Sequence, residues 1–145
     1  MFLIGSLNIG GAERQLVELV KNIEKSNLKI TVAIFYNQGD FRYGIKEIPN
    51  TNLICLNKSG RWDLFRLIYN LRKALIKIRP DIVYSFMPGA NILGLISSKL
   101  ALKSKIVWGI RATNMKASNY HWFNIITQIL QKTLSSLPDA IIVNS

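Results

Sequence analysis

Short apolar segments typical of β-strands alternate about six times with longer segments whose apolar residues recur at helical spacing. The strand-like segments are residues 2–4, 29–36, 52–56, 81–86, 105–110 and 139–143. The helix-like segments are residues 12–26, 43–48, 62–78, 90–102 and 119–137. Strands that alternate with helices pair in parallel, because each helix carries the chain back across the sheet. The alternation predicts an α/β fold, a Rossmann-like doubly wound parallel sheet of about six strands with helices on both faces and strand order 3-2-1-4-5-6.

The length of 145 residues suffices for one domain with a core, so residues 1–145 are predicted to form a single domain. The lone cysteine, Cys55, cannot form an internal disulfide, which indicates a reducing compartment. No signal peptide is visible, and the longest uncharged stretch, 82–98, contains Pro, Gly and Asn residues that disfavour a membrane span. We therefore expect a cytoplasmic protein and exclude integral membrane proteins and disulfide scaffolds.

The formal net charge of +11 is concentrated in the second part of the chain. Residues 58–145 contain thirteen Lys and Arg against three Asp and Glu, whereas residues 1–57 contain six against five. Such a field attracts polyanions, which include nucleic acid, anionic lipid and phosphorylated substrates. Basic residues are dense in and around the segment 62–78, where a solvated face and attraction to anionic lipid are both open. These residues are Lys58, Arg61, Arg66, Arg72, Lys73, Lys77 and Arg79.

The first loop contains glycines at positions 5, 10 and 11. This spacing does not fit the dinucleotide fingerprint GxGxxG, and Gly11-Ala12 stands where a P-loop requires Lys-Ser/Thr, so an NTPase is excluded. What remains is a pair of glycines, Gly10-Gly11, immediately before a helix. Free amides and the helix dipole at such a position favour a diphosphate. The alternative is a tight turn that serves packing alone.

Four motifs in order resemble the amino-terminal domain of glycosyltransferase family 4. They are GGAERQL (10–16), VYSFMPGANILG (83–94), KIVWGIRATN (105–114) and PDAIIVNS (138–145). The resemblance implies one half of a GT-B fold, in which two Rossmann-like domains face each other across a cleft. It implies that the amino-terminal half binds the acceptor and closes its glycine loop over the donor diphosphate. The carboxy-terminal half, which binds the nucleotide sugar through a paired-glutamate motif, is absent from this sequence.

The resemblance implies a retaining transfer of a sugar from a nucleotide-sugar donor to a cell-envelope or lipid-linked glycan. We expect no metal and no cofactor other than the nucleotide sugar as co-substrate. Expected partners are the nucleotide sugar, the acceptor, an anionic membrane surface at the inner face of the cell membrane, and a separately encoded donor domain. Because the donor half is absent, the isolated chain is expected to transfer no sugar.

Site residues are assigned from the loops that follow predicted strands. For the donor diphosphate they are Gly10, Gly11 and Arg14; for the acceptor they are Asn8, Asn91, Arg111 and Asn114. Arg111 is also the candidate for stabilising phosphate in the transition state, because its guanidinium is always charged and bonds in a fork. The asparagines have an alternative role as turn or cap residues, and Arg111 as a salt-bridge partner. Many relatives place a histidine in the loop that here reads Arg-Ala-Thr-Asn, so a role for that histidine does not carry over.

Two rival functions remain open: a basic nucleic-acid-binding domain, and a non-functional gene fragment that folds. The nucleic-acid alternative is not favoured, because the aromatic residues are mostly spaced as core residues. His121, the only histidine, has no second histidine or carboxylate cluster near it in sequence, so metal binding is not expected. The apolar stripe of the segment 119–137 is expected to lie in the core, with a membrane interface as the alternative. Its residues are Trp122, Phe123, Ile126, Ile129, Leu130, Leu134 and Leu137.

Overall fold

The computed structural model describes residues 1–23, 27–60, 63–101, 104–111 and 122–144, which form a parallel six-stranded sheet in the order β3-β2-β1-β4-β5-β6. The strands are β1 (Phe2–Ile4), β2 (Ile30–Ile34), β3 (Thr51–Cys55), β4 (Ile82–Phe86), β5 (Lys105–Arg111) and β6 (Ala140–Asn144). The helices are α1 (Gly11–Ile23), α2 (Phe41–Lys46), α3 (Leu64–Ile78), α4 (Pro88–Ala101) and α5 (Trp122–Thr133). The predicted fold class and strand order are confirmed.

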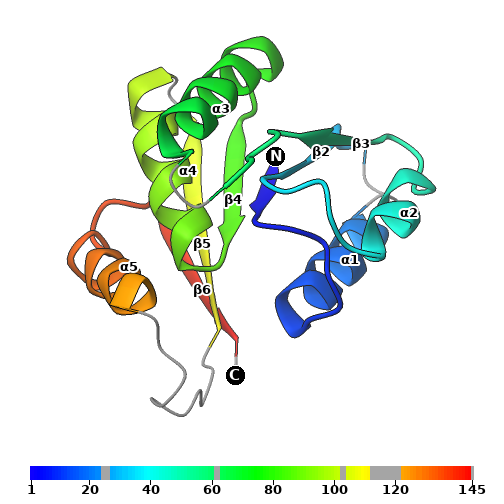
Figure 1. Ribbon diagram of the computed structural model, residues 1–145. Helices are drawn as coiled ribbons and strands as arrows, with labels where there is room; N and C mark the ends of the chain where they lie inside the picture. The colour runs from blue at the N-terminus through cyan, green and yellow to red at the C-terminus, as the bar shows by residue number, and fades with distance from the viewer. Residues whose placement is uncertain (24–26, 61–62, 102–103, 112–121, 145) are drawn as a thin grey trace.

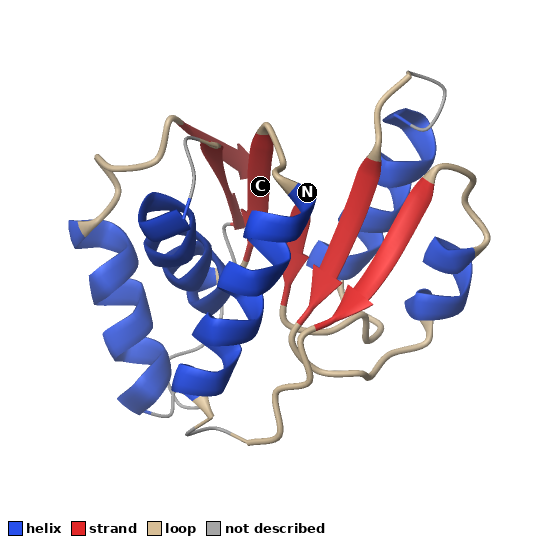
Figure 2. Ribbon diagram, turned by 90° about the horizontal axis from the view of Figure 1, so that it is seen from above, coloured by secondary structure: helices blue, strands red, loops and turns tan. Residues whose placement is uncertain are grey.

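The sheet is covered by helices on both faces, with α1 and α2 on one side and α3, α4 and α5 on the other (Figures 1 and 2). The strand side chains alternate accordingly, because successive residues of a strand point to opposite faces. Phe2 and Ile4 of β1 pack in the cluster that contains Leu16 of α1. Leu3, between them, packs in the cluster that contains Leu71 of α3. Two apolar cores therefore sandwich the sheet.

Helices α3 and α4 begin and end where their local chemistry dictates. Helix α3 ends at Ile78, because the next residue, Arg79, adopts a left-handed conformation (φ 49°) and is followed by Pro80, a residue that cannot continue a helix. Helix α4 begins at Pro88, two residues before the predicted start, because proline suits the first turn, where its missing N–H is not needed. These residues therefore fix where α3 ends and where α4 begins.

Strands β5 and β6 are joined at their amino ends by Asp139. Its carboxylate accepts hydrogen bonds from the Ile106 amide (2.8 Å) and from Lys105 Nζ (3.0 Å). The Ile106 amide and the Lys105 ammonium both stabilise the ionised form, so they lower the pKa of the Asp139 carboxyl below its ordinary value. This arrangement fixes the register of the last strand against β5.

The core expectation for the stripe of α5 is wrong for most of its described side chains. Ile126, Ile129, Leu130 and Leu137 are each at least 42% exposed, and Leu134 alone among the described members packs against a core cluster, that of Trp108. The periodicity correctly predicts a helix, but helical spacing does not reveal what covers the apolar face. No described helix is both long and apolar enough to cross a bilayer.

Candidate functional site

The candidate site lies where β1 and β4 end, at the carboxyl edge of the sheet. These two strands are neighbours, yet α1, which follows β1, covers one face and α4, which follows β4, covers the other. The loops after the two strands therefore lead to opposite faces of the sheet. In doubly wound sheets this topological switch point is the usual ligand site. Residues 5–10 follow β1 at this switch point, and the turn at Met87 follows β4.

The first loop is fixed at its middle by the turn that follows β2. Leu7 is fully buried; its amide donates to the Gln38 carbonyl (3.1 Å), and its carbonyl accepts from the Phe41 amide (3.2 Å). Gly39, at φ 107°, lies so close that a Cβ there would overlap the Leu7 carbonyl group and the Asn8 amide nitrogen. The turn therefore clamps the loop at Leu7 and leaves residues 8–11 at the surface.

Arg42 holds this clamping turn in shape. Its Nε donates to the Gly39 carbonyl (2.9 Å), and its Nη1 donates to the carbonyl (2.9 Å) and the side chain of Asn37. A single guanidinium thus bonds both ends of the turn, which restrains the backbone that contacts Leu7. Sequence reasoning missed both Gly39 and Arg42, because only the fold brings the turn after β2 against the first loop.

The predicted diphosphate residues Gly10 and Gly11 lie at the start of α1. Gly10 accepts the first helical hydrogen bond, from the Arg14 amide to its carbonyl (3.0 Å). Neither the Gly10 amide nor the Gly11 amide donates a hydrogen bond within the described part of the chain. Free amides at a helix start carry the positive end of the helix dipole. The loop therefore presents donors and partial positive charge at the carboxyl edge.

The Glu13 carboxylate occupies this positive end in the structure. A Cβ added to Gly10 would contact Glu13 Oε2, so the carboxylate lies directly beside the glycine. An acidic side chain in the first turn stabilises the helix dipole. A diphosphate bound at the same amides would have to displace this carboxylate, which is half-buried and forms no ion pair with a described residue.

The remaining predicted residues of the first loop and helix are exposed. Asn8 points to solvent and has no hydrogen bond within the described residues. Arg14 is exposed and is absent from the two ion pairs that the described residues form. Both side chains are thus accessible on the chain segment that carries Gly10 and Gly11.

The turn between β4 and α4 is strained and anchors one predicted residue in the interior. Met87 adopts φ 78°, a conformation that is unfavourable for a side chain with a Cβ and that recurs at functional sites. Asn91 is fully buried; its Nδ2 donates to the Gly109 carbonyl of β5 (3.3 Å), and its Oδ1 has no partner among the described residues. Asn91 therefore links α4 to β5 through its side-chain amide. This contact favours a structural role for Asn91 over contact with an acceptor.

The other predicted residues lie partly or wholly outside the described residues. Arg111 ends β5, and its backbone is in register with Asn144 of β6, which places it at the carboxyl edge. Asn114 and His121 lie outside the described residues. Within the described ranges, no group of three His, Cys, Asp or Glu residues is placed to hold a metal ion.

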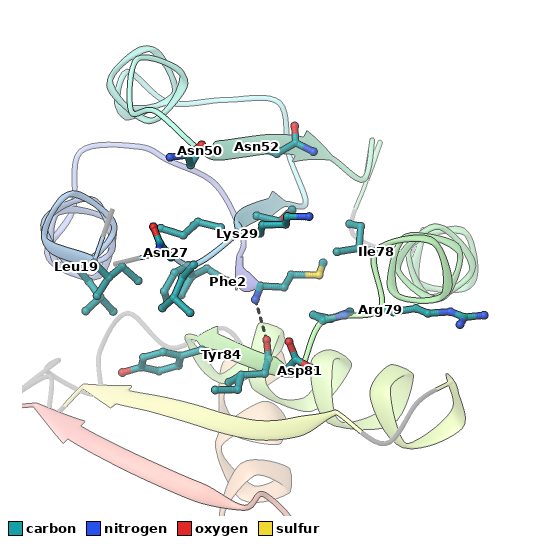
Figure 3. Close-up of a pocket in the computed structure, with 17 residues that line it drawn as sticks. Phe2, Leu19, Asn27, Lys29, Asn50, Asn52, Ile78, Arg79, Asp81 and Tyr84 are labelled. Atoms are coloured by element: carbon teal, nitrogen blue, oxygen red, sulfur yellow. Dashed lines mark hydrogen bonds between the residues drawn. The ribbon is translucent and has the colours of Figure 1, made fainter. Parts of the chain in front are cut away.

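A hollow of about 1000 Å³ lies at the opposite, amino edge of the sheet (Figure 3). Strand β1 has three residues while its neighbours β2 and β4 have five, and Phe2 pairs with Val32 and Tyr84, the third residue of each. The Met1 amino group donates a hydrogen bond to the Ile82 carbonyl there (2.7 Å). Burial lowers the pKa of this amino group to about 6, while the nearby negative charge of Asp81 acts to raise it. This hollow lies at the opposite edge of the sheet from the predicted site.

Comparisons with known proteins agree with the four motifs. The family model described as Glycosyltransferase Family 4 matches residues 9–145. The chain belongs to glycosyltransferase family 4. The resemblance identified from the motifs is thereby confirmed, and the chain is part of a family of glycosyltransferases.

Individual relatives of this glycosyltransferase family 4 chain are much longer than it is. It is 31% identical over 114 residues to GalNAc-alpha-(1->4)-GalNAc-alpha-(1->3)-diNAcBac-PP-undecaprenol alpha-1,4-N-acetyl-D-galactosaminyltransferase of Campylobacter jejuni subsp. jejuni serotype O:2, across 73% of this chain and 30% of the relative. The crystal structure of Anabaena Alr3699/HepE in complex with UDP and glucose is similar in fold, with a TM-score of 0.69 and 19% identity over 99% of this chain and 37% of that chain. The chain spans about a third of the length of each.

Proposed function

We propose that the chain is the acceptor-binding half of a glycosyltransferase that moves a sugar from a nucleotide-sugar donor to a cell-envelope or lipid-linked glycan. In this proposal the Gly10 and Gly11 amides bind the donor diphosphate, while a donor-binding half supplies the nucleotide pocket. In this proposal, residues 1–145 by themselves transfer no sugar.

The observation that carries the proposal is the pair of unbonded amides at the start of α1, beside the switch point between β1 and β4. A diphosphate needs several N–H donors in a small area, and a helix start provides them together with a favourable dipole. The Campylobacter relative is named for a diphosphate-linked undecaprenol substrate, and the Anabaena structure holds UDP and glucose. Both names are consistent with a diphosphate ligand.

Further parts of the proposal rest on family membership and charge. We infer that transfer retains the anomeric configuration, needs no metal, and takes place at the inner face of the cell membrane. Arg14 and Arg111 are the candidate cations for the diphosphate, and Asn8 and Asn114 the candidate acceptor contacts. The net charge of +11 favours a phosphorylated substrate and an anionic membrane surface.

The test is a pair of substitutions at Gly11 that differ by one N–H group. Gly11→Pro removes the amide hydrogen at the first helical position, where proline is well tolerated. Gly11→Ala keeps the amide. We expect the binding of UDP, measured by isothermal titration calorimetry, to weaken about ten- to a hundredfold in Gly11→Pro, because a hydrogen bond to a charged group is lost.

The matched variant Gly11→Ala should bind UDP within a factor of about three of the unchanged chain, because its N–H donor remains. Thermal unfolding of both variants provides the check that α1 still forms. Equal UDP affinity in the proline and alanine variants would contradict a role for this amide.

A further inference from the structure

The Glu13 carboxylate lies at the start of α1 without an ion-pair partner among the described residues. Its side chain is half-buried, and neither of the two ion pairs that these residues form includes it. The next residue, Arg14, is exposed and does not pair with it. A carboxylate that is partly withdrawn from water needs a compensating positive charge. The positive end of the α1 dipole supplies that charge here.

The position of Glu13 in the helix explains how its carboxylate reaches this point. Gly11 is the first residue of α1, so Glu13 is the third. A glutamate at the third helical position can turn back towards the residue that precedes the helix, as in a capping box. The structure shows this arrangement, because a Cβ on Gly10 would overlap Glu13 Oε2. The Glu13 carboxylate therefore fills the space that a side chain on Gly10 would take.

The carboxylate fills this space without bonding the donors around it. Neither the Gly10 amide nor the Gly11 amide donates a hydrogen bond to Glu13 or to another residue that the structure describes. Glu13 is thus held by the charge of the helix start, while the two N–H groups remain unbonded. A ligand whose oxygen atoms bond both amides has an advantage that Glu13 does not have in this arrangement.

We propose that Glu13 is an intramolecular competitor for the diphosphate site and thereby determines which anions bind there. The inference rests on the proposed function, because it concerns the same two amides. An anion binds only when the carboxylate swings away, so it has to gain more from the amides than Glu13 gives up. Because the carboxylate is attached to the helix, its effective concentration at the site is high. The apparent affinity of every ligand is reduced by the fraction of chains in which the site is open.

This competition favours diphosphates over weaker anions. A free carboxylate resembles the Glu13 side chain in charge and in its oxygen atoms, so it gains little by replacing a group that is already attached. A diphosphate carries more negative charge and more acceptor oxygens, so it can bond the Gly10 and Gly11 amides together. We therefore expect UDP and inorganic pyrophosphate to displace Glu13, and acetate to leave it in place.

The first test removes the competing charge in two ways. Glu13→Gln keeps the length of the side chain, whereas Glu13→Ala removes it. Both variants should bind UDP about three- to tenfold more tightly than the unchanged chain in isothermal titration calorimetry, because no carboxylate holds the site. Inorganic pyrophosphate should show the same gain, since it has the diphosphate and no uridine. A gain in the glutamine variant alone would overturn the proposal, because the new amide donor would then be its cause.

Glu18 provides a matched control on the same helix. It is exposed, lies more than one turn beyond Glu13, and pairs with Lys21 (3.3 Å). Glu18→Gln changes the net charge by the same amount as Glu13→Gln but leaves the helix start as it is. Its UDP affinity should stay within a factor of about two of the unchanged chain, because an exposed charge at this distance is screened. An equal gain in both variants would contradict a local competition.

Thermal unfolding adds a readout that a purely structural role of Glu13 would not move. Without ligand, Glu13→Gln should unfold about 1–3 °C below the unchanged chain, because the helix start loses its anion. With saturating UDP this difference should disappear, because the diphosphate has replaced the carboxylate in the unchanged chain as well. The same difference with and without UDP would overturn the proposal, since Glu13 would then stabilise the helix and not compete with the ligand.

The variants of Gly11 separate this inference from the proposed function. Equal UDP affinity in Gly11→Pro and Gly11→Ala contradicts both, because the amide is then not the site. Weaker binding by Gly11→Pro, together with unchanged affinity in the two Glu13 variants, contradicts the competition alone and leaves the proposed function supported.

Discussion

Replacement of Gly39 by alanine is expected to lower the free energy of unfolding by on the order of 3 kcal/mol. Two causes act together at this residue. Its φ of 107° is a conformation that side chains with a Cβ rarely adopt, and the added Cβ would overlap the backbone of Leu7 and Asn8. Backbone cannot rotate away as the end of a flexible side chain can. The first loop must therefore move, and with it the start of α1.

Gly44→Ala is the matched control for this prediction. Gly44 lies inside α2, and nothing is within 4 Å of the position that its Cβ would take. Alanine is better than glycine in a helix, so this variant should gain about 0.5–1 kcal/mol. Urea unfolding followed by circular dichroism compares the two. A Gly39→Ala variant as stable as the unchanged chain would show that the clamp on Leu7 is not needed.

The second large effect is expected for Trp108→Ala, at about 3–5 kcal/mol of lost stability. Trp108 is fully buried in β5 and packs in a cluster with Leu95, Ile106 and Leu134. This cluster attaches α4, and the turn after α5 that contains Leu134, to the strand that ends at Arg111. Removal of the indole leaves a cavity that these neighbours cannot close without shifting the strand.

Trp108→Phe should cost clearly less than Trp108→Ala. It keeps an aromatic ring in the cluster and removes an indole N–H that has no hydrogen-bond acceptor among the described residues. Thermal unfolding of the two variants checks this order. A loss in Trp108→Phe that equals the loss in Trp108→Ala would contradict the packing account.

The fold could be predicted from the sequence because each part of it has a local signal. The alternation of strand and helix dictates a parallel sheet, and the preference for right-handed crossovers selects the strand order. Most described boundaries lie within two residues of the expected ones, as Pro88 does for α4, whereas α5 ends at Thr133, four residues before the expected end at 137. The exposure of the apolar stripe of α5 was not predictable, since periodicity marks an apolar face without showing what covers it.

The position of Gly10 and Gly11 at a helix start could be predicted from the sequence, and the contacts that support their loop could not. Gly10 and Gly11 precede a helix after a strand, which is a local pattern. The contact of Gly39 with Leu7 joins residues far apart in sequence, so no local pattern reveals it. The burial of Asn91 was also not predictable: its position after a strand suggested ligand contact, whereas the fold buries its amide, which donates to the Gly109 carbonyl.

The central claim is that the amides at the start of α1 receive a diphosphate. Nuclear magnetic resonance of the ¹⁵N-labelled chain during titration with UDP observes these amides one by one. The account predicts that the signals of Gly10 and Gly11 shift most and that inorganic pyrophosphate shifts the same signals. If both remain in place while UDP shifts amides at the amino edge, such as those of Thr31 and Asn52 beside the hollow, the assignment of the site is contradicted.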